Sequence, residues 1–212
     1  LQYMPPHAPT ALPDTPLLTA IRDAQASDQL IDSLVRSRPD AAWARDADGN
    51  LPLSLLAQRL SPPAGVESVR ALLRAHPNAA AVPRRTGIQF LPLHLAIMSG
   101  AADGAVLALL TAHPTAAAVA GSERSDYPLH LACEYGSSLA VMERLIKAYP
   151  AAAAARMAGD AGYLAVHLAA RYRSPAAVFA LLLAAHPAGV RAVGPYGDLP
   201  LHLAAEHAAP ME

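Results

Sequence analysis

The sequence contains one cysteine and few aromatic residues, and these shortages exclude several kinds of protein. A single cysteine, Cys133, cannot build an internal disulfide framework. Aromatic residues make up only 5% of the 212 residues, so Leu, Val and Ala must fill the core, which suits closely packed helices. The longest apolar run, 176–185, is too short to cross a bilayer and ends at His186. The opening residues also lack the charged start and apolar centre of a secretory signal.

The charge is nearly balanced, with a formal net charge of −1. An excess of neither sign gives no reason to expect binding to nucleic acid or to an acidic membrane surface. No strand pattern precedes a glycine-rich loop, so no phosphate-binding loop is predicted. The sequence therefore predicts no cofactor, no nucleic-acid partner and no direct membrane insertion.

Two short motifs recur along the chain. The first is Leu-Pro-Leu-His-Leu-Ala with its variants, which begin at residues 51, 91, 127, 164 and 199. The second is a proline that follows an apolar segment, at Pro39, Pro77, Pro114, Pro150 and Pro187. Both motifs recur at intervals of 35 to 40 residues. Two independent motifs that share one period indicate a stacked array of small units.

Each unit is predicted to contain two helices and a loop. A Leu-Pro pair favours the start of a short helix, because proline suits the first helical position. In the second helix Met142, Leu145, Ile146 and Tyr149 fall on one apolar stripe, and Pro150 ends it. A polar or glycine-bearing loop follows. No unit could bury its stripe alone, so neighbouring units must stack.

This pattern resembles the ankyrin repeat, whose usual mark is Thr-Pro-Leu-His followed by Leu-Ala. The resemblance covers roughly residues 16–212 and implies an all-α, ankyrin-like solenoid of helix-turn-helix units with connecting finger loops. Leu or Tyr replaces the threonine throughout, Ala165 replaces one proline, and Ser54 replaces the first histidine. The His-Pro-x-Ala-Ala sequence after the second helix resembles ankyrin-like proteins of algae and other protists.

We divide the chain into an extended, proline-rich segment at 1–15 and a repeat array at 16–212. The predicted units span about 16–45, 46–84, 85–121, 122–158, 159–194 and 195–212, the last being incomplete. An uncapped stack exposes apolar surface, so we expect the protein to continue past Glu212, or its cap to lie there. A partner that covers this end is the alternative.

The repeated histidines are expected to be structural. They are His94, His130, His167 and His202. The ankyrin resemblance implies a Thr–His hydrogen bond, which the missing threonine makes unavailable. We therefore expect the rings to bond backbone groups of the adjoining loops where two units meet.

Catalytic and metal-binding arrangements are weak in this sequence. Cys133 and His130 lie three apart on one predicted helix, a spacing that any helix offers, and nothing nearby marks an activated thiol. His202 and His207 do not share a helical face as a metal pair would. We predict that the protein is not an enzyme and binds no metal; a hydrolase using Cys133 or a histidine pair is the alternative from another class.

A binding surface is the stronger prediction. The loops and the exposed sides of the first helices are expected to form a concave face, where Tyr and Arg often anchor protein contacts. The candidate partner-binding residues are Arg84, Arg85, Phe90, Met98, Glu134, Tyr135, Tyr163, Arg171, Tyr172 and Tyr196. Arg124 adds a further loop-tip candidate. For Tyr163 and Tyr196, packing against the next loop is the alternative.

These observations predict a non-catalytic scaffold or adaptor that binds another protein on its concave face. The alternatives are an accessory subunit of a larger, organellar assembly, or a regulatory module of a larger enzyme or channel. We expect an intracellular, cytoplasmic location, with a plastid as the alternative. The identity of the partner does not follow from the sequence, because a shared scaffold carries no ligand by itself.

Overall fold

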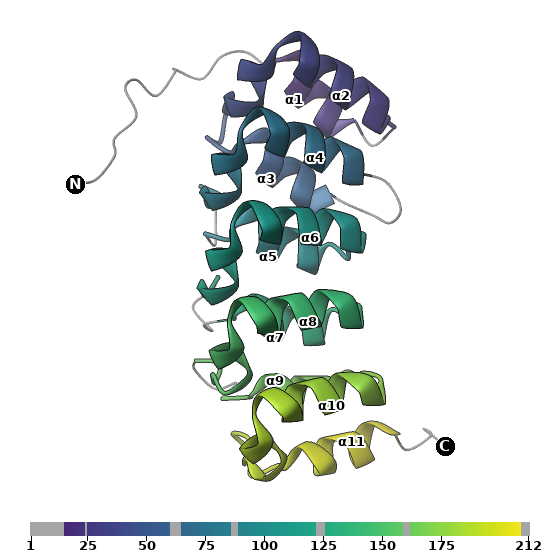
Figure 1. The fold of residues 1–212 in the computed structure, drawn as a ribbon, viewed down its shortest axis with the longest axis vertical. Coiled ribbons are helices and arrows are strands. Elements are labelled where there is room, and N and C mark those ends of the chain that lie inside the picture. Colours follow the sequence, from purple (N-terminus) through teal and green to yellow (C-terminus); the bar gives the residue numbers. More distant parts are fainter. Residues whose placement is uncertain are drawn as a thin grey trace, which may run out of the picture.

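The computed structural model describes residues 15–23, 25–59, 65–85, 89–121, 126–158 and 162–208. Over these ranges the chain forms α-helices and short 3₁₀ helices and contains no strand. The helices lie in layers along one long axis (Figure 1). The predicted all-α solenoid is therefore confirmed.

Every unit contributes a first and a second α-helix. The first helices are α1 (Pro16–Arg22), α3 (Pro52–Arg59), α5 (Pro92–Met98), α7 (Pro128–Glu134), α9 (Ala165–Arg171) and α11 (Pro200–Ala208). The second helices are α2 (Asp28–Ser37), α4 (Val66–Ala75), α6 (Asp103–Ala112), α8 (Leu139–Ala148) and α10 (Ala176–Ala185). Proline opens each first helix except α9, because its missing N–H would be unpaired there in any case.

A 3₁₀ helix follows each second helix, which sequence reasoning did not predict. These turns are η1 (Pro39–Trp43), η2 (Pro77–Ala81), η3 (Pro114–Ala118), η4 (Pro150–Ala153) and η6 (Pro187–Arg191). The repeat proline thus ends one helix and starts the next. Small residues after it, such as Ala79 and Ala116, are each 1% exposed and let the turn pack tightly against its neighbours.

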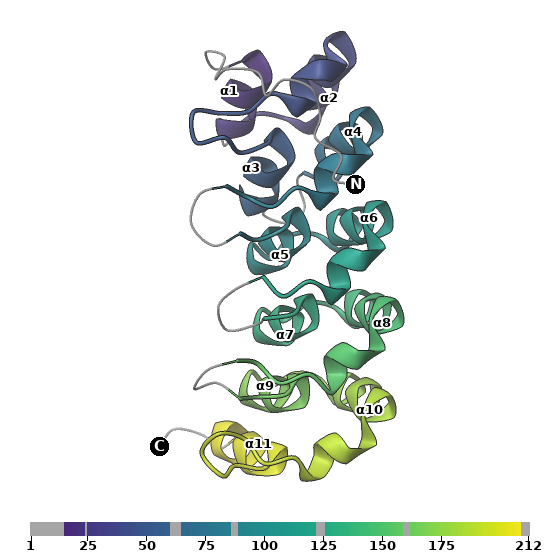
Figure 2. The same ribbon diagram turned by 90° about the vertical axis from the view of Figure 1, so that its left-hand side faces the viewer.

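The first helices form one row and the second helices another (Figure 2). Each first helix packs against the first helices before and after it, and the second helices do the same. One continuous core of Leu, Val and Ala runs through these contacts. Most of segment 1–15 lies outside the described residues; Thr15 caps α1 by accepting a hydrogen bond from the Leu18 N–H at 3.3 Å.

The loop between units is a narrow finger whose two ends are joined by a backbone hydrogen bond that recurs from unit to unit. In the first finger the Asp46 N–H donates to the Asn50 carbonyl at 3.0 Å. The equivalent bonds join Arg84 to Phe90, Gly121 to Asp126, Met157 to Tyr163 and Gly194 to Asp198. The recurrence of this bond fixes both ends of each finger on the first-helix side of the stack.

Candidate interaction surface and the repeat histidines

Three repeat histidines tie their helices, α5, α7 and α9, to the base of the finger that follows. The Nε2 atoms of His94, His130 and His167 lie 2.9, 3.0 and 3.0 Å from backbone carbonyl oxygens. The acceptors are Val119, Ala155 and Ala192 in turn. The prediction that these rings bond backbone groups of adjoining loops is therefore confirmed.

The other ring nitrogen fixes the tautomer. The Tyr127 N–H donates to His130 Nδ1 at 3.3 Å, and the Leu164 N–H donates to His167 Nδ1 at 3.2 Å. Since an amide can only donate and a carbonyl can only accept, Nδ1 is bare and Nε2 carries the proton. His130 and His167 thus each cap the start of their own helix and anchor the next finger in their neutral form.

Burial supports the same protonation state. His94, His130 and His167 are each 0% exposed. Burial lowers the pKa of all three, because a charged imidazolium would lose its hydration, and the carbonyl hydrogen bonds oppose this only in part. The rings are accordingly neutral structural groups at physiological pH.

An aromatic ring covers each of these histidines. The ring centroids lie 5.5 Å apart for Phe90 and His94, and 5.5 Å apart for Tyr163 and His167. Phe90 is 8% exposed and Tyr163 is 5% exposed. The Tyr163 hydroxyl donates to Asp198 Oδ2 at 3.4 Å, and burial raises its pKa.

This packing corrects two of the predicted partner-binding residues. Tyr163 is wrong as a surface anchor, because its ring closes the joint between units. Phe90 is wrong as an exposed loop tip, since it is buried and its ring packs against His94. For Tyr163 the alternative of packing against the next loop applies. Tyr196 differs, because it is 75% exposed on its finger.

The remaining candidates lie on the first-helix surface, which we define as the ends of the first helices together with the fingers. Tyr135 and Tyr172 are exposed at the ends of α7 and α9, one unit apart. The Tyr172 hydroxyl donates to Glu134 Oε1 at 3.4 Å, a contact between those two units. Arg171 and Arg85 are exposed, whereas Met98 and Arg84 are half-buried. Arg124 lies outside the described residues.

A cleft of about 310 Å³ opens on this surface beside α5. Phe90, Leu95 and Met98 line it with apolar groups, and Gln58, Arg84 and Ser99 line it with polar ones. Three predicted partner-binding residues, Arg84, Phe90 and Met98, therefore meet at one hollow. Phe90 lines this cleft although only 8% of the residue is exposed.

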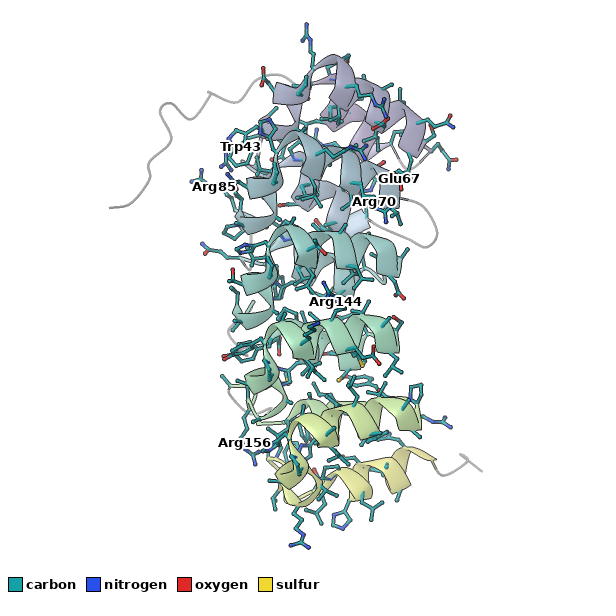
Figure 3. All side chains as sticks on the ribbon, in the orientation of Figure 1. Trp43, Glu67, Arg70, Arg85, Arg144 and Arg156 are labelled. Atoms are coloured by element: carbon teal, nitrogen blue, oxygen red, sulfur yellow. The ribbon has the colours of Figure 1, made fainter. Side chains whose placement is uncertain are left out.

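Sequence reasoning missed the arginines that brace the fingers. Arg156 Nη1 donates to the Gly162 carbonyl at 2.7 Å and to the Val193 carbonyl at 3.0 Å, and so links two fingers. Arg45 Nη1 donates to the Gly49 carbonyl at 2.6 Å. Figure 3 shows Arg156 on the finger side of the stack. Both arginines lie six residues after the repeat proline of their unit. This shared position was the sign in the sequence that they have a common structural role.

The thiol and metal alternatives find no support in the described residues. Cys133 is 0% exposed, and burial raises the pKa of its thiol to about 12. His130 cannot serve as its base, because both ring nitrogens already bond backbone groups. No three His, Cys, Asp or Glu side chains within the described ranges lie together as metal ligands would.

None of the helices in the described part of the chain combines the length and the apolar character needed to cross a membrane.

No family model matches the sequence, and no curated protein matches it. By contrast, 269 chains of solved structures are similar in fold. One belongs to the complex of the predatory endopeptidase Bd0816 from Bdellovibrio bacteriovorus with the immunity protein Bd3460. It matches with a TM-score of 0.62 and 17% identity, over 87% of this chain and 93% of that one. At this identity the likeness shows the fold alone, and a fold alone carries no ligand.

Proposed function

We propose that this chain is a non-catalytic, ankyrin-like interaction module that binds another protein through its first-helix surface. The observation that carries the proposal is the exposure of Tyr135 and Tyr172, at 44% and 45%, on consecutive units. In a protein with so few aromatic residues, Tyr127 packs against Tyr149 and Tyr163 packs against His167, whereas Tyr135 and Tyr172 stay exposed. Exposed tyrosines are typical anchors of protein interfaces.

The charged and apolar groups around these tyrosines fit the same role. Arg171 and Glu134 flank the two rings, and the cleft beside α5 offers an apolar pocket within the same surface. The surface rests on fingers that backbone bonds and arginines hold in place. A prebuilt surface of this kind loses little conformational entropy on binding. The solved neighbour comes from a complex of two proteins, which agrees with the proposal without testing it.

A quantitative pull-down with a matched control tests the proposal. The test variant carries Tyr135→Ala and Tyr172→Ala; the control carries Glu143→Ala and Lys147→Ala on the exposed side of α8. We expect one or more proteins captured from native lysate by the wild type to be lost with the tyrosine variant and kept with the control. Each tyrosine anchor is expected to contribute about 2 kcal/mol to binding.

Circular dichroism must show that both variants keep the helical fold. An unchanged set of captured proteins, with the fold intact, would contradict recognition through the first-helix surface.

A further inference from the structure

The second helices carry a surface of their own, on the side of the stack away from the fingers (Figure 2). Two turns before the repeat proline, α2, α4 and α8 place Asp32, Arg70 and Glu143 on this surface. The equivalent residue in α6 is Leu107, and residues 104–121 contain no Asp, Glu, Lys or Arg. The outer side of α6 is therefore apolar between two helices whose outer sides are charged.

A groove of about 540 Å³ lies where this apolar side meets α4. Leu73 of α4 and Leu107, Ala108 and Ala112 of α6 supply its apolar lining. Gly104 stands at one end, where an added Cβ would come within 3.0 Å of Val66 Cγ1. The glycine therefore leaves this end of the groove without a side chain and lets α6 approach α4 closely.

The charged lining of the groove has one sign. Arg70 and Arg74 line it from α4, one helical turn apart, and no carboxylate of the described residues lines it. Arg70 pairs with Glu67 at 2.8 Å and Arg74 with Asp32 at 2.9 Å, yet the two side chains are 51% and 58% exposed. A guanidinium has five N–H donors, so each keeps donors for a further carboxylate. Figure 3 shows Arg70 beside Glu67 on α4.

We propose that this groove between α4 and α6 binds an acidic amphipathic helix of a partner protein. Apolar side chains of that helix would rest on Leu107 and Ala108, and its carboxylates would meet Arg70 and Arg74. An extended peptide fits poorly, because both walls are helices whose backbone groups are already bonded and cannot add a strand. Residues one turn apart on each wall match the side-chain rows of a packed helix.

A synthetic peptide tests the chemistry of the groove. The probe is a fluorescein-labelled helical peptide of about 16 residues, with leucines on one face and glutamates along its edges. The matched peptide carries lysine at every glutamate. We expect the acidic peptide to bind in a fluorescence-anisotropy titration, to bind more weakly as salt is raised, and to bind better than the lysine peptide.

Matched variants test the location. Leu107→Glu with Ala108→Glu places carboxylates on the groove floor, and α8 already tolerates charge at these positions, with Glu143 and Arg144. We expect binding roughly tenfold weaker or worse, because the apolar floor is lost and the new charges repel the peptide. The control, Ala180→Glu with Leu181→Glu, makes the same charge change at the same positions of α10 and should bind as the wild type does.

Absence of binding by the acidic peptide, equal binding by the lysine peptide, or equal loss in the α6 and α10 variants would each overturn the proposal. The variant with Tyr135→Ala and Tyr172→Ala should keep full peptide binding, because those residues lie on the first-helix surface. Loss of peptide binding in that variant, with the α6 variant unaffected, would overturn the groove and leave the first-helix surface as the binding site. Failure of the groove therefore leaves the proposed function standing.

Discussion

The joints inside the stack and the C-terminal end of the described chain share a motif but bury it differently. Leu129 in α7 is 1% exposed, whereas the equivalent Leu201 in α11 is 74% exposed. His130 is fully buried, whereas His202 is exposed. The same residue types are therefore buried inside the stack and exposed at the end of the described chain. What makes them core is the neighbouring unit, as expected for a quasi-one-dimensional array.

A comparison of His130 with His202 distinguishes the two hydrogen bonds that a repeat histidine can make. His202 Nδ1 still accepts the Leu199 N–H at 3.2 Å, as His130 and His167 do at their own helix starts. It contacts no backbone carbonyl through Nε2 within the described residues, whereas His130 Nε2 reaches the Ala155 carbonyl. The helix cap is thus a property of one unit, and the carbonyl contact is a property of the joint.

Acidification should give the largest contrast between the two regions. The lowered pKa of the buried histidines means that they stay neutral in the folded state while the unfolded chain takes up protons below its ordinary pKa of about 6.5. The contribution of these neutral rings to the free energy of unfolding is complete above that pH and is lost as the pH falls below it. With three such sites, the free energy of unfolding should fall by at most about 4 kcal/mol per pH unit.

Urea unfolding between pH 7.5 and 5, followed by circular dichroism, measures this slope. A free energy of unfolding that stays flat across this range would contradict neutral buried rings.

Truncating the equivalent leucines should give the next largest contrast. Leu129→Ala removes a fully buried side chain from a joint and should cost about 3 kcal/mol through lost burial and a residual cavity. Leu201→Ala should change the free energy of unfolding by no more than about 0.5 kcal/mol, as surface substitutions do. Chemical denaturation of the two variants side by side checks this, and similar losses would show that Leu201 is covered in solution.

The histidine pair should give a smaller contrast of the same sign. His130→Ala leaves the Tyr127 N–H and the Ala155 carbonyl without their partner in a buried setting, which should cost about 2 kcal/mol. His202→Ala removes only an exposed cap and should cost about 0.5 kcal/mol. Thermal unfolding of both proteins at pH 7.5 is the measurement, and equal losses would contradict the division between cap and joint.

The smallest contrast concerns the backbone just after the first helices. Gly136 has a φ of 70° after α7, whereas Arg173 takes a φ of 56° at the equivalent place after α9. Side chains are strained in this region, so Arg173→Gly should stabilise the protein and Gly136→Ala should destabilise it, each by about 1 kcal/mol. Differential scanning calorimetry can resolve shifts of opposite sign, and a destabilising Arg173→Gly would show that the arginine makes a compensating contact.

The fold was largely predictable because period and proline position are local signals. Repeats of one length with one apolar stripe leave stacking as the only way to bury it. The 3₁₀ turns were harder to predict, because the proline, as at Pro150, predicts the end of a helix and does not by itself indicate a further turn. Its small neighbours Ala152 and Ala153 were the available sign that the chain continues in a tight, buried turn.

The site was predictable only in part. The histidines were assigned to backbone contacts, but which carbonyl each reaches depends on the turn and finger that return the chain to it. The position of Phe90 and Tyr163 at finger ends predicts surface anchors. Each lies four residues before its histidine, as Phe90 lies before His94, and in this structure that spacing pairs the two rings. The groove between α4 and α6 could not be predicted from the sequence, because it forms only where the two helices pack side by side.

The histidine contact at the joints goes to a main-chain carbonyl, at His94, His130 and His167, and not to a matched side chain. Any following unit that presents a carbonyl at the same place can therefore accept this contact. Duplication, deletion or exchange of whole units by recombination would require no compensating substitution at this histidine. Such a chain can lengthen, shorten or be rebuilt in the laboratory while its outward residues diversify independently.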